Sequence, residues 1–151
     1  MANASEIREI SLEGFKVVSG EMFNHLPRKS EPTCTMWSSS LSFSKMAISM
    51  LNNCERIRIE VNAQQKRLLA IPVTAKDRDN VRWVKSVKEL TSRKLECRGF
   101  TAPLFEAWKW DEAYVYRAVG KLVTANQKVM LLFDFNDAEN WKAKPKDKVD
   151  A

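Results

Sequence analysis

The sequence predicts an α+β fold in which a curved antiparallel sheet carries two helices on one side. The main observation is an internal repeat: residues 43–83 are echoed by residues 100–141. Each copy begins with Phe followed by Ser or Thr, continues through a helix-like stretch into two strand-like runs, and closes with an Asp four residues before a Trp. The matching positions are Phe43 and Phe100, Ser44 and Thr101, Asp79 and Asp137, and Trp83 and Trp141. Two pseudo-symmetric copies of strand, helix, strand, strand form such a sheet most economically.

The length and composition of the chain are those of one globular domain. It has 151 residues, of which 44% are hydrophobic. We therefore expect a single domain over residues 1–151, with repeat one at about 33–83, repeat two at about 93–141 and a flexible tail at 142–151. The alternative is that the two halves resemble each other by coincidence, because many α+β proteins contain this succession of elements.

The N-terminal third precedes most of the first repeat. Gly14–Val18 is predicted to form a first strand, and residues 19–32 a loop, because glycine and proline interrupt them. Residues 33–37 and 40–43 are predicted to form a hairpin that turns through the serines at 38–40.

The first repeat continues with a helix and a hairpin. Ser44 is the expected N-cap, because its hydroxyl can accept a backbone N–H of the first turn. Apolar residues then recur at helical spacing, namely Met46, Ala47, Met50 and Leu51. Residues 56–61 alternate Ile or Val with charged residues, which predicts a half-buried strand. Residues 66–73 supply the pairing strand, and Pro72 limits the ladder hydrogen bonds near its end.

The second repeat is predicted to follow the same order. A strand at 93–98 leads to an N-cap at Thr101, and Pro103 lies in the first turn of a helix that we expect to be shorter than the first. Two long strands follow at 113–123 and 128–135, joined by a turn at residues 124–127. Alternate apolar residues define one face of the last strand: Val129, Leu131, Phe133 and Phe135.

The formal charge of +6 is unevenly distributed along the chain. Residues 56–98 contain twelve basic and five acidic side chains, a net charge of +7, whereas the remainder of the chain nets −1. A basic segment of this kind favours contact with a polyanion such as DNA or RNA. The alternative is that these side chains only solvate the open face of a sheet.

Arg56 and Arg58 are the sharpest candidates for phosphate contacts. Alternate residues of a strand face the same way, so both would lie on the face opposite Ile57 and Ile59. Arg67 joins them if the strand register allows it, and guanidinium groups suit phosphates because they offer a planar fork of donors and stay charged. The candidate nucleic-acid-binding residues are Arg56, Arg58, Lys66, Arg67, Lys76, Arg78, Arg82, Lys85, Lys88, Arg93 and Lys94.

No enzyme signature accompanies this basic segment. The chain has four glycines without a Gly-rich phosphate loop, and its one histidine, His25, lies in a polar, loop-like stretch. Asp77 with Asp79, and Asp134 with Asp137, could hold Mg²⁺, but such aspartates more commonly cap the start of a helix. We predict no catalytic residue, no metal site and no cofactor.

The cysteines and the termini bear on the cellular compartment. Cys34, Cys54 and Cys97 are widely spaced and include no Cys-x-x-Cys pair, so we expect reduced thiols. The first ten residues are polar, unlike a signal peptide, and no apolar run approaches the roughly 20 residues that span a membrane. We therefore expect a cytoplasmic protein with no membrane partner.

Six strings in the chain resemble those of a known group of proteins. They are Phe43-Ser44-Lys45, Arg56 to Ile59, Lys66 to Val73, Asp79 to Trp83, Phe100 to Trp108 and Lys128 to Phe135, within residues 27–137. They are similar to short uncharacterised proteins encoded beside large serine recombinases in mobile elements of Gram-positive bacteria. Where those proteins have Arg-Pro, this chain has Ile71-Pro72, which removes one charge from the inferred binding face. The resemblance implies an accessory role in recombination or element maintenance and supplies no catalytic residue.

We expect a non-enzymatic nucleic-acid-binding accessory protein, linked to a mobile-element recombinase, that contacts DNA or RNA phosphates without strong sequence reading. The alternative is a protein-interaction module that docks on a recombinase or on itself, without nucleic-acid contact. Exposed apolar side chains on the second hairpin would favour this alternative. The sequence leaves the oligomeric state open.

Overall fold

The computed structural model describes residues 7–18, 31–86, 88 and 92–144. The strands of this part are β1 (Thr33–Met36), β2 (Ser40–Phe43), β3 (Arg56–Asn62), β4 (Arg67–Val73), β5 (Asn80–Arg82), β6 (Leu95–Glu96), β7 (Tyr114–Ala125), β8 (Lys128–Asp134) and β9 (Glu139–Lys142). The helices are α1 (Lys45–Met50), α2 (Arg98–Ala107) and a short 3-10 helix, η3 (Phe135–Asp137).

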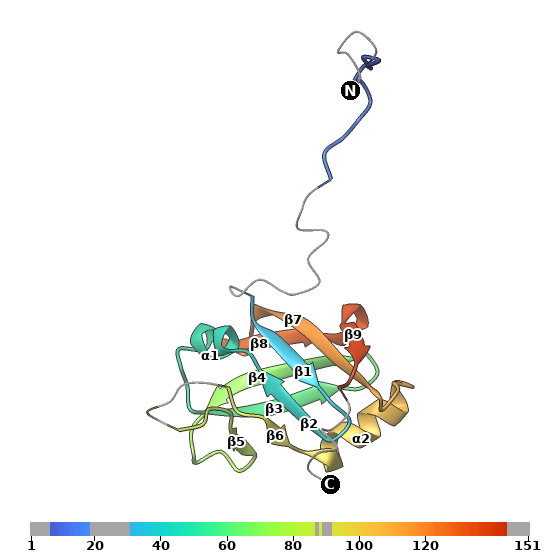
Figure 1. Cartoon of the computed structure of the whole chain (residues 1–151). Coiled ribbons are helices and arrows are strands. Elements are labelled where there is room, and N and C mark those ends of the chain that lie inside the picture. Colours follow the sequence, from blue (N-terminus) through green and yellow to red (C-terminus); the bar gives the residue numbers. More distant parts are fainter. Residues whose placement is uncertain (1–6, 19–30, 87, 89–91, 145–151) are drawn as a thin grey trace.

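All paired strands are antiparallel and belong to one curved sheet. Its order is β5-β3-β4-β8-β7-β1-β2-β6, and β9 pairs with β7 beside this path. The sheet curls into a half-barrel (Figure 1), so that β5 and β6, the two ends of the order, approach each other. The α+β class and the curved antiparallel sheet are as predicted from the sequence.

The predicted first hairpin and first helix are present. β1 and β2 pair across a tight turn, in which the backbone N–H of Trp37 donates to the carbonyl of Ser40 at 2.8 Å. Ser44 caps α1 as predicted, and its Oγ accepts the backbone N–H of Ala47 at 3.2 Å. The same Oγ accepts the N–H of Thr33 at 2.9 Å, so one hydroxyl fixes α1 to the start of β1.

Two hairpins, β3–β4 and β7–β8, form the centre of the sheet. The second turns through Asn126 and Gln127, whose φ angles of 52° and 65° fit a two-residue hairpin turn. The hairpins join where β4 pairs with β8, and there Leu68 lies opposite Phe133 with both side chains fully buried. The joint between the two halves of the chain is therefore part of the core.

One hydrophobic cluster fills the inside of the curved sheet. It contains Ala47 and Ile48 of α1, Leu104 and Phe105 of α2, and inward-facing residues of the strands such as Ile57. Both helices thus pack on the same core, although they lie at opposite ends of the curved sheet rather than beside each other (Figure 1).

The predicted strand at Gly14–Val18 is wrong. Residues 7–18 contain no strand; the N–H of Phe15 donates to the carbonyl of Leu12 at 3.1 Å in a turn where Gly14 has a φ of 86°. A strand needs the backbone of a neighbour for its hydrogen bonds, and no described strand lies beside this segment. Residues 19–30 of the predicted loop, including His25, lie outside the described residues.

The start of the second helix also differs from the prediction. The strand expected at 93–98 shrinks to β6, and α2 begins at Arg98, because the carbonyl of Cys97 already accepts the N–H of Thr101 at 3.0 Å. Thr101 is therefore not an N-cap; it is buried, and its Oγ1 donates to the carbonyl of Ser38 at 2.8 Å. Pro103 lies inside the helix, which has ten residues against six in α1, so the expectation of a shorter second helix is wrong as well.

The structure does not establish the internal repeat. The order β2, α1, β3, β4, β5 does match β6, α2, β7, β8, β9. However, Trp83 is buried in the core, whereas Trp141 is 38% exposed on β9, beneath the guanidinium of Arg117. The tail predicted at residues 142–151 overlaps β9 at Lys142, and residues 145–151 lie outside the described part.

Candidate nucleic-acid interface

Most of the predicted basic residues gather along one edge of the half-barrel. This edge is formed by β5, by the turn that precedes it and by the segment that leads into β6. Ile57 of β3 faces the core, so Arg56 and Arg58 face outward, as the strand alternation predicts. Arg82 of β5 lies directly opposite Arg56 on the neighbouring strand.

Arg56, Arg82 and Arg93 form what we call the arginine cluster. The Nη1 atom of Arg56 donates to Oδ1 of Asn80 at 2.6 Å, and Nη1 of Arg93 donates to the carbonyl of Arg82 at 3.4 Å. None of the three makes an ion pair within the described chain, and the buried Nε of Arg82 has no hydrogen-bond partner there. Like charges directly opposite each other on a sheet are destabilising, so an anion at this place would stabilise the pair.

Arg58 differs from its neighbour because two carboxylates neutralise it. Its guanidinium contacts Asp77 at 2.7 Å and Glu60 at 3.0 Å. The hydrogen bond to Asp77, followed by the one to Glu60, raises the pKa of Arg58. The pKa of Asp77 is lowered, mainly by the backbone N–H of Asp79 and also by Arg58. Arg56 and Arg58 therefore share the outward face as predicted, but only Arg58 is neutralised by carboxylates, and the arginine opposite Arg56 on the neighbouring strand is Arg82.

Arg67 does not join the arginine cluster. It lies opposite Asn62 at the far end of β3, four residues from Arg58 or about 13 Å along an extended strand. There its guanidinium lies 3.6 Å from the carboxylate of Asp134, whose pKa is lowered mainly by hydrogen bonds from Asn136. The pairing register thus separates Arg67 from the other predicted contacts.

The remaining predicted residues flank the cluster or lie away from it. Lys76 and Arg78 are exposed in the turn before β5, Lys85 and Lys88 are exposed after it, and Lys94 is exposed just before β6. The Nζ atom of Lys94 lies 4.3 Å from the centre of the Trp37 ring, an arrangement that favours a cation–π contact. Lys66 lies in the turn between β3 and β4, with a φ of 55°, and so belongs to the distant end of the hairpin.

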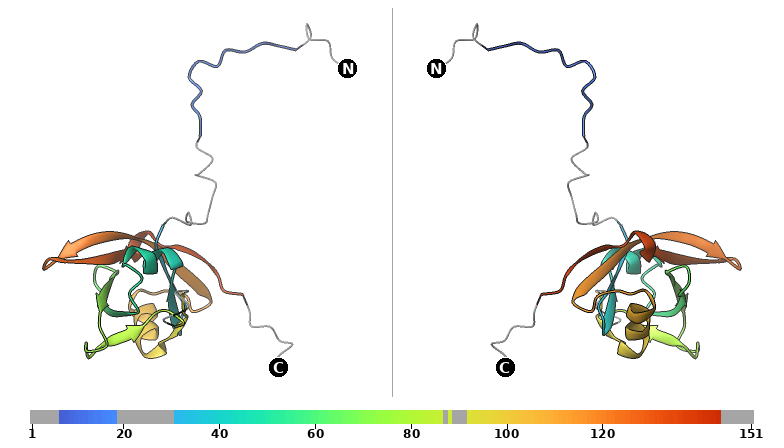
Figure 2. Two further views of the ribbon diagram at one scale, coloured as in Figure 1. Left: turned by 90° about the vertical axis from the view of Figure 1, so that its left-hand side faces the viewer. Right: turned by 90° about the vertical axis from the view of Figure 1, so that its right-hand side faces the viewer.

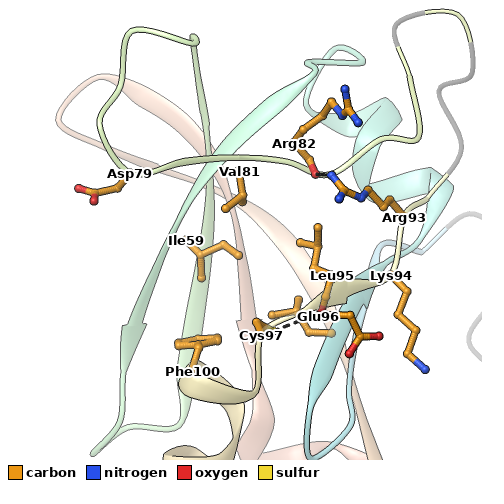
Figure 3. A pocket seen from close by; sticks show the side chains of 11 residues that line it. Ile59, Asp79, Val81, Arg82, Arg93, Lys94, Leu95, Glu96, Cys97 and Phe100 are labelled. Atoms are coloured by element: carbon orange, nitrogen blue, oxygen red, sulfur yellow. Dashed lines mark hydrogen bonds between the residues drawn. The ribbon is translucent and has the colours of Figure 1, made fainter.

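A cleft of about 500 Å³ lies beside the arginine cluster, between the two ends of the sheet. Its floor is apolar, formed by Leu41, Ile59, Val81, Leu95, Cys97 and Phe100, and its rim is charged, formed by Asp79, Arg82, Arg93, Lys94 and Glu96. Figure 3 shows Val81 and Leu95 on opposite walls, with the side chain of Arg82 directed away from the floor. No sequence pattern marks this cleft, because only the curl of the sheet brings β5 and β6 together.

The paired aspartates cap their own turns. Oδ1 of Asp77 accepts the N–H of Asp79 at 2.8 Å, and Oδ1 of Asp134 accepts the N–H of Asn136 at the start of η3 at 2.9 Å. Among the described residues, no group of three or more His, Cys, Asp or Glu side chains is placed to hold a metal ion. None of the helices in that part of the chain is long and apolar enough to cross a membrane.

Comparisons with protein-family models, with curated proteins and with solved structures find no match for this chain. What the protein binds must therefore be inferred from its own residues.

Proposed function

We propose that this protein is a non-enzymatic nucleic-acid-binding accessory protein that contacts phosphates through the arginine cluster. The observation that carries the proposal is the cross-strand pair of Arg56 and Arg82, two arginines on the outward face of neighbouring strands that make no ion pair within the described chain. A phosphate at this place would accept charge-assisted hydrogen bonds from both and offset their mutual repulsion. The resemblance of the sequence to proteins encoded beside serine recombinases supports a role next to such an enzyme.

The surroundings of the cluster favour binding to the backbone of the nucleic acid rather than to its bases. Exposed cations flank the cluster on both sides in the chain, namely Lys76, Arg78, Lys85, Lys88 and Lys94. Trp83, the aromatic residue next to Arg82, is buried and its Nε1 donates to the carbonyl of Cys54 at 2.7 Å, so it offers no stacking surface. Contacts to phosphates position a protein without reading sequence, so we expect weak sequence preference.

A salt titration of binding tests this function. Fluorescence anisotropy with labelled duplex DNA, single-stranded DNA and RNA would compare the intact protein with Arg56→Gln/Arg82→Gln. We expect the intact protein to bind with a steep salt dependence and the double variant to lose about two phosphate contacts. On duplex DNA each lost contact makes the slope of log K against log salt shallower by about 0.9.

Arg67→Gln is the matched control, because it removes one positive charge at an arginine that is already paired with Asp134. It should change the salt slope by much less than half of the change in the double variant. Absence of salt-dependent binding to all three nucleic acids would eliminate the proposed function. An equal loss in the Arg67→Gln control would show that the cluster is not the site.

A second candidate function is a protein-interaction module. It is favoured by the β7–β8 hairpin, whose tip extends beyond the rest of the sheet (Figure 2). Val119, Leu122 and Val129 of this hairpin are each between 45% and 49% exposed. Co-sedimentation with a purified large serine recombinase would test it: loss of association in Leu122→Asp, with retention in Arg56→Gln/Arg82→Gln, would favour this function over the first.

We also propose that the two halves of the chain derive from one duplicated unit and now differ in role. The first half contributes Arg56 and Arg82 to the arginine cluster, and the second contributes the apolar hairpin. The matching order of elements supports this proposal. Superposition of residues 43–73 on residues 100–135 in a crystal structure tests it, and a failure to align the two helices with their hairpins would refute it.

A further inference from the structure

The segment 7–18, which we call the N-terminal arm, exposes six large apolar side chains. Ile7, Ile10, Leu12, Phe15, Val17 and Val18 are each between 58% and 98% exposed. Such a density of exposed apolar residues is typical of a surface that has a partner. In Ile10-Ser11-Leu12-Glu13 the apolar residues alternate with polar ones, the period of a strand that covers an apolar surface on one side.

The cleft beside the arginine cluster lacks a strand. The edges of β5 and β6 face each other across it with no described strand between them. The segment after β5 and the segment before β6 are joined by a bridge between Val84 and Ser92, next to which the N–H of Arg93 donates to the carbonyl of Trp83 at 3.2 Å. Beyond this point the two strands separate, and Val81 and Leu95 lie on opposite walls (Figure 3). The separation opens the cleft.

The strand registers direct backbone groups of both edges into the cleft. The N–H of Trp83 donates to Glu55 beside β3, and the N–H of Cys97 donates to Ser39 beside β2. Residues of an antiparallel strand bond alternately to the two sides, so the backbone groups of Arg82 and Glu96 point the other way, toward the cleft. Within the described chain, the carbonyl of Arg82 accepts only the long hydrogen bond from Nη1 of Arg93 at 3.4 Å, which an added strand would displace. Such a strand would pair with these backbone groups, the mode of recognition known as β-augmentation.

We propose that the N-terminal arm of a second copy of this chain docks in the cleft as an added strand, with Ile10 and Leu12 on the apolar floor. The charges of the two surfaces agree with this assignment. Glu9 and Glu13 flank the two apolar residues, and they meet a rim on which the cations Arg82, Arg93 and Lys94 outnumber the acids Asp79 and Glu96. The other apolar pair of the arm, Phe15 and Val17, encloses Lys16 and matches this rim less well.

The position of the arm in the fold favours a second copy over the chain's own cleft. β1 begins at Thr33 on the upper side of the half-barrel, whereas β5 and β6 lie on its lower side (Figure 1). The arm would have to pass around the body to reach its own cleft, which favours docking in the cleft of a neighbour. Reciprocal exchange of two arms gives a closed twofold dimer. The proposal does not depend on nucleic-acid binding, since it uses strand edges and the apolar floor.

Sedimentation velocity of the full chain over a range of concentrations tests the proposal. We expect a monomer–dimer equilibrium whose dissociation constant rises about tenfold or more in Leu12→Asp, because a charge would enter an apolar floor. The matched control is Ser11→Asp, which adds the same charge one residue away on the side of the added strand that carries Glu9 and Glu13, and which should not weaken the dimer. Near-ultraviolet circular dichroism should be the same for all three proteins, because both positions lie outside the core.

Photo-crosslinking locates the contact and identifies the chain that supplies it. The photoreactive residue benzoylphenylalanine is placed at position 12, and unlabelled protein is mixed with isotope-labelled protein. We expect crosslinks to residues 93–97 that join an unlabelled chain to a labelled one. The proposal is overturned by a monomer at all concentrations, by a dimer that Leu12→Asp does not weaken, or by crosslinks to residues 93–97 found only within one chain.

Discussion

Gly120 and Gly99 show how the surroundings of a residue decide its tolerance to the same change. A Cβ atom on Gly120 would lie 2.5 Å from Cε1 of the fully buried Phe133, its cross-strand partner, whereas a Cβ on Gly99 in α2 would meet nothing within 4 Å. We therefore predict that Gly120→Ala lowers the free energy of unfolding by about 1–3 kcal/mol through overpacking.

Gly99→Ala is the matched control and should raise the free energy of unfolding by up to about 1 kcal/mol, because alanine has the higher helix propensity. Urea unfolding followed by circular dichroism measures both variants. A Gly120→Ala protein as stable as the original chain would show that the Phe133 ring can move aside and that the core is loosely packed there.

The three thiols also depend on their surroundings. Burial raises the pKa of Cys54 and of Cys97 to about 11, and burial together with the nearby Cys97 raises the pKa of Cys34 well above its ordinary value. These raised values favour the neutral thiol in the folded state. The stability that they contribute is fully present below the ordinary thiol pKa of about 8.5 and is lost as the pH rises through the folded values.

We predict slow reaction of all three thiols with a disulfide reagent at pH 8, with Cys34 reacting only on unfolding. The free energy of unfolding should fall between about pH 9 and pH 11 as the unfolded chain ionises first. Reagent kinetics and urea titrations at several pH values measure the two effects. Rapid labelling of Cys34 in the folded protein would contradict the burial on which the prediction rests.

At the scale of elements, Ser44 and Thr101 occupy the same place in the repeated sequence pattern, but Ser44 caps a helix whereas Thr101 lies within one. The strand β2 ends at Phe43, so Ser44 is free to cap α1, whereas β6 ends at Glu96 and α2 has already begun before Thr101. The N-cap preference of serine and threonine therefore predicted the cap of α1 correctly, but it placed the start of α2 at Thr101 instead of at Arg98. The length of the preceding strand, which depends on its partners, made the difference.

We predict that Ser44→Ala destabilises the protein by about 1–2 kcal/mol, because it removes a helix cap and leaves the N–H groups of Ala47 and Thr33 without this acceptor. Ser44→Thr keeps the hydroxyl and should retain most of the stability. Thermal unfolding followed by circular dichroism measures the series. Equal losses in both variants would indicate a steric effect rather than a lost cap.

At the scale of the whole molecule, the pairing of β4 with β8 ties the two halves together. Buried residues from Cys34 to Phe135 contribute to one hydrophobic cluster, and strand order mixes the halves by placing β1 and β2 between β7 and β6. Neither half can keep its apolar surface covered without the other. This arrangement favours unfolding of the described fold in one step.

We predict coincident urea transitions for tryptophan fluorescence and far-ultraviolet circular dichroism. The probes are well placed, because Trp83 lies in the core contributed by the first half and Trp108 in that contributed by the second. Two separate transitions would instead show that the repeats fold as independent units.

The sequence by itself determined the hairpins, the first helix and the outward direction of Arg56 and Arg58, because side-chain alternation, caps and turn residues act over a few neighbouring positions. Tertiary structure alone decided that Asp77 neutralises Arg58 and that Arg82 lies opposite Arg56. It also decided that the strand register places Arg67 beside Asp134, at the other end of the β3–β4 hairpin. It also created the cleft between β5 and β6. The physical reason is that periodicity records which face of an element is apolar, whereas the partners of that element depend on the order and curl of the whole sheet.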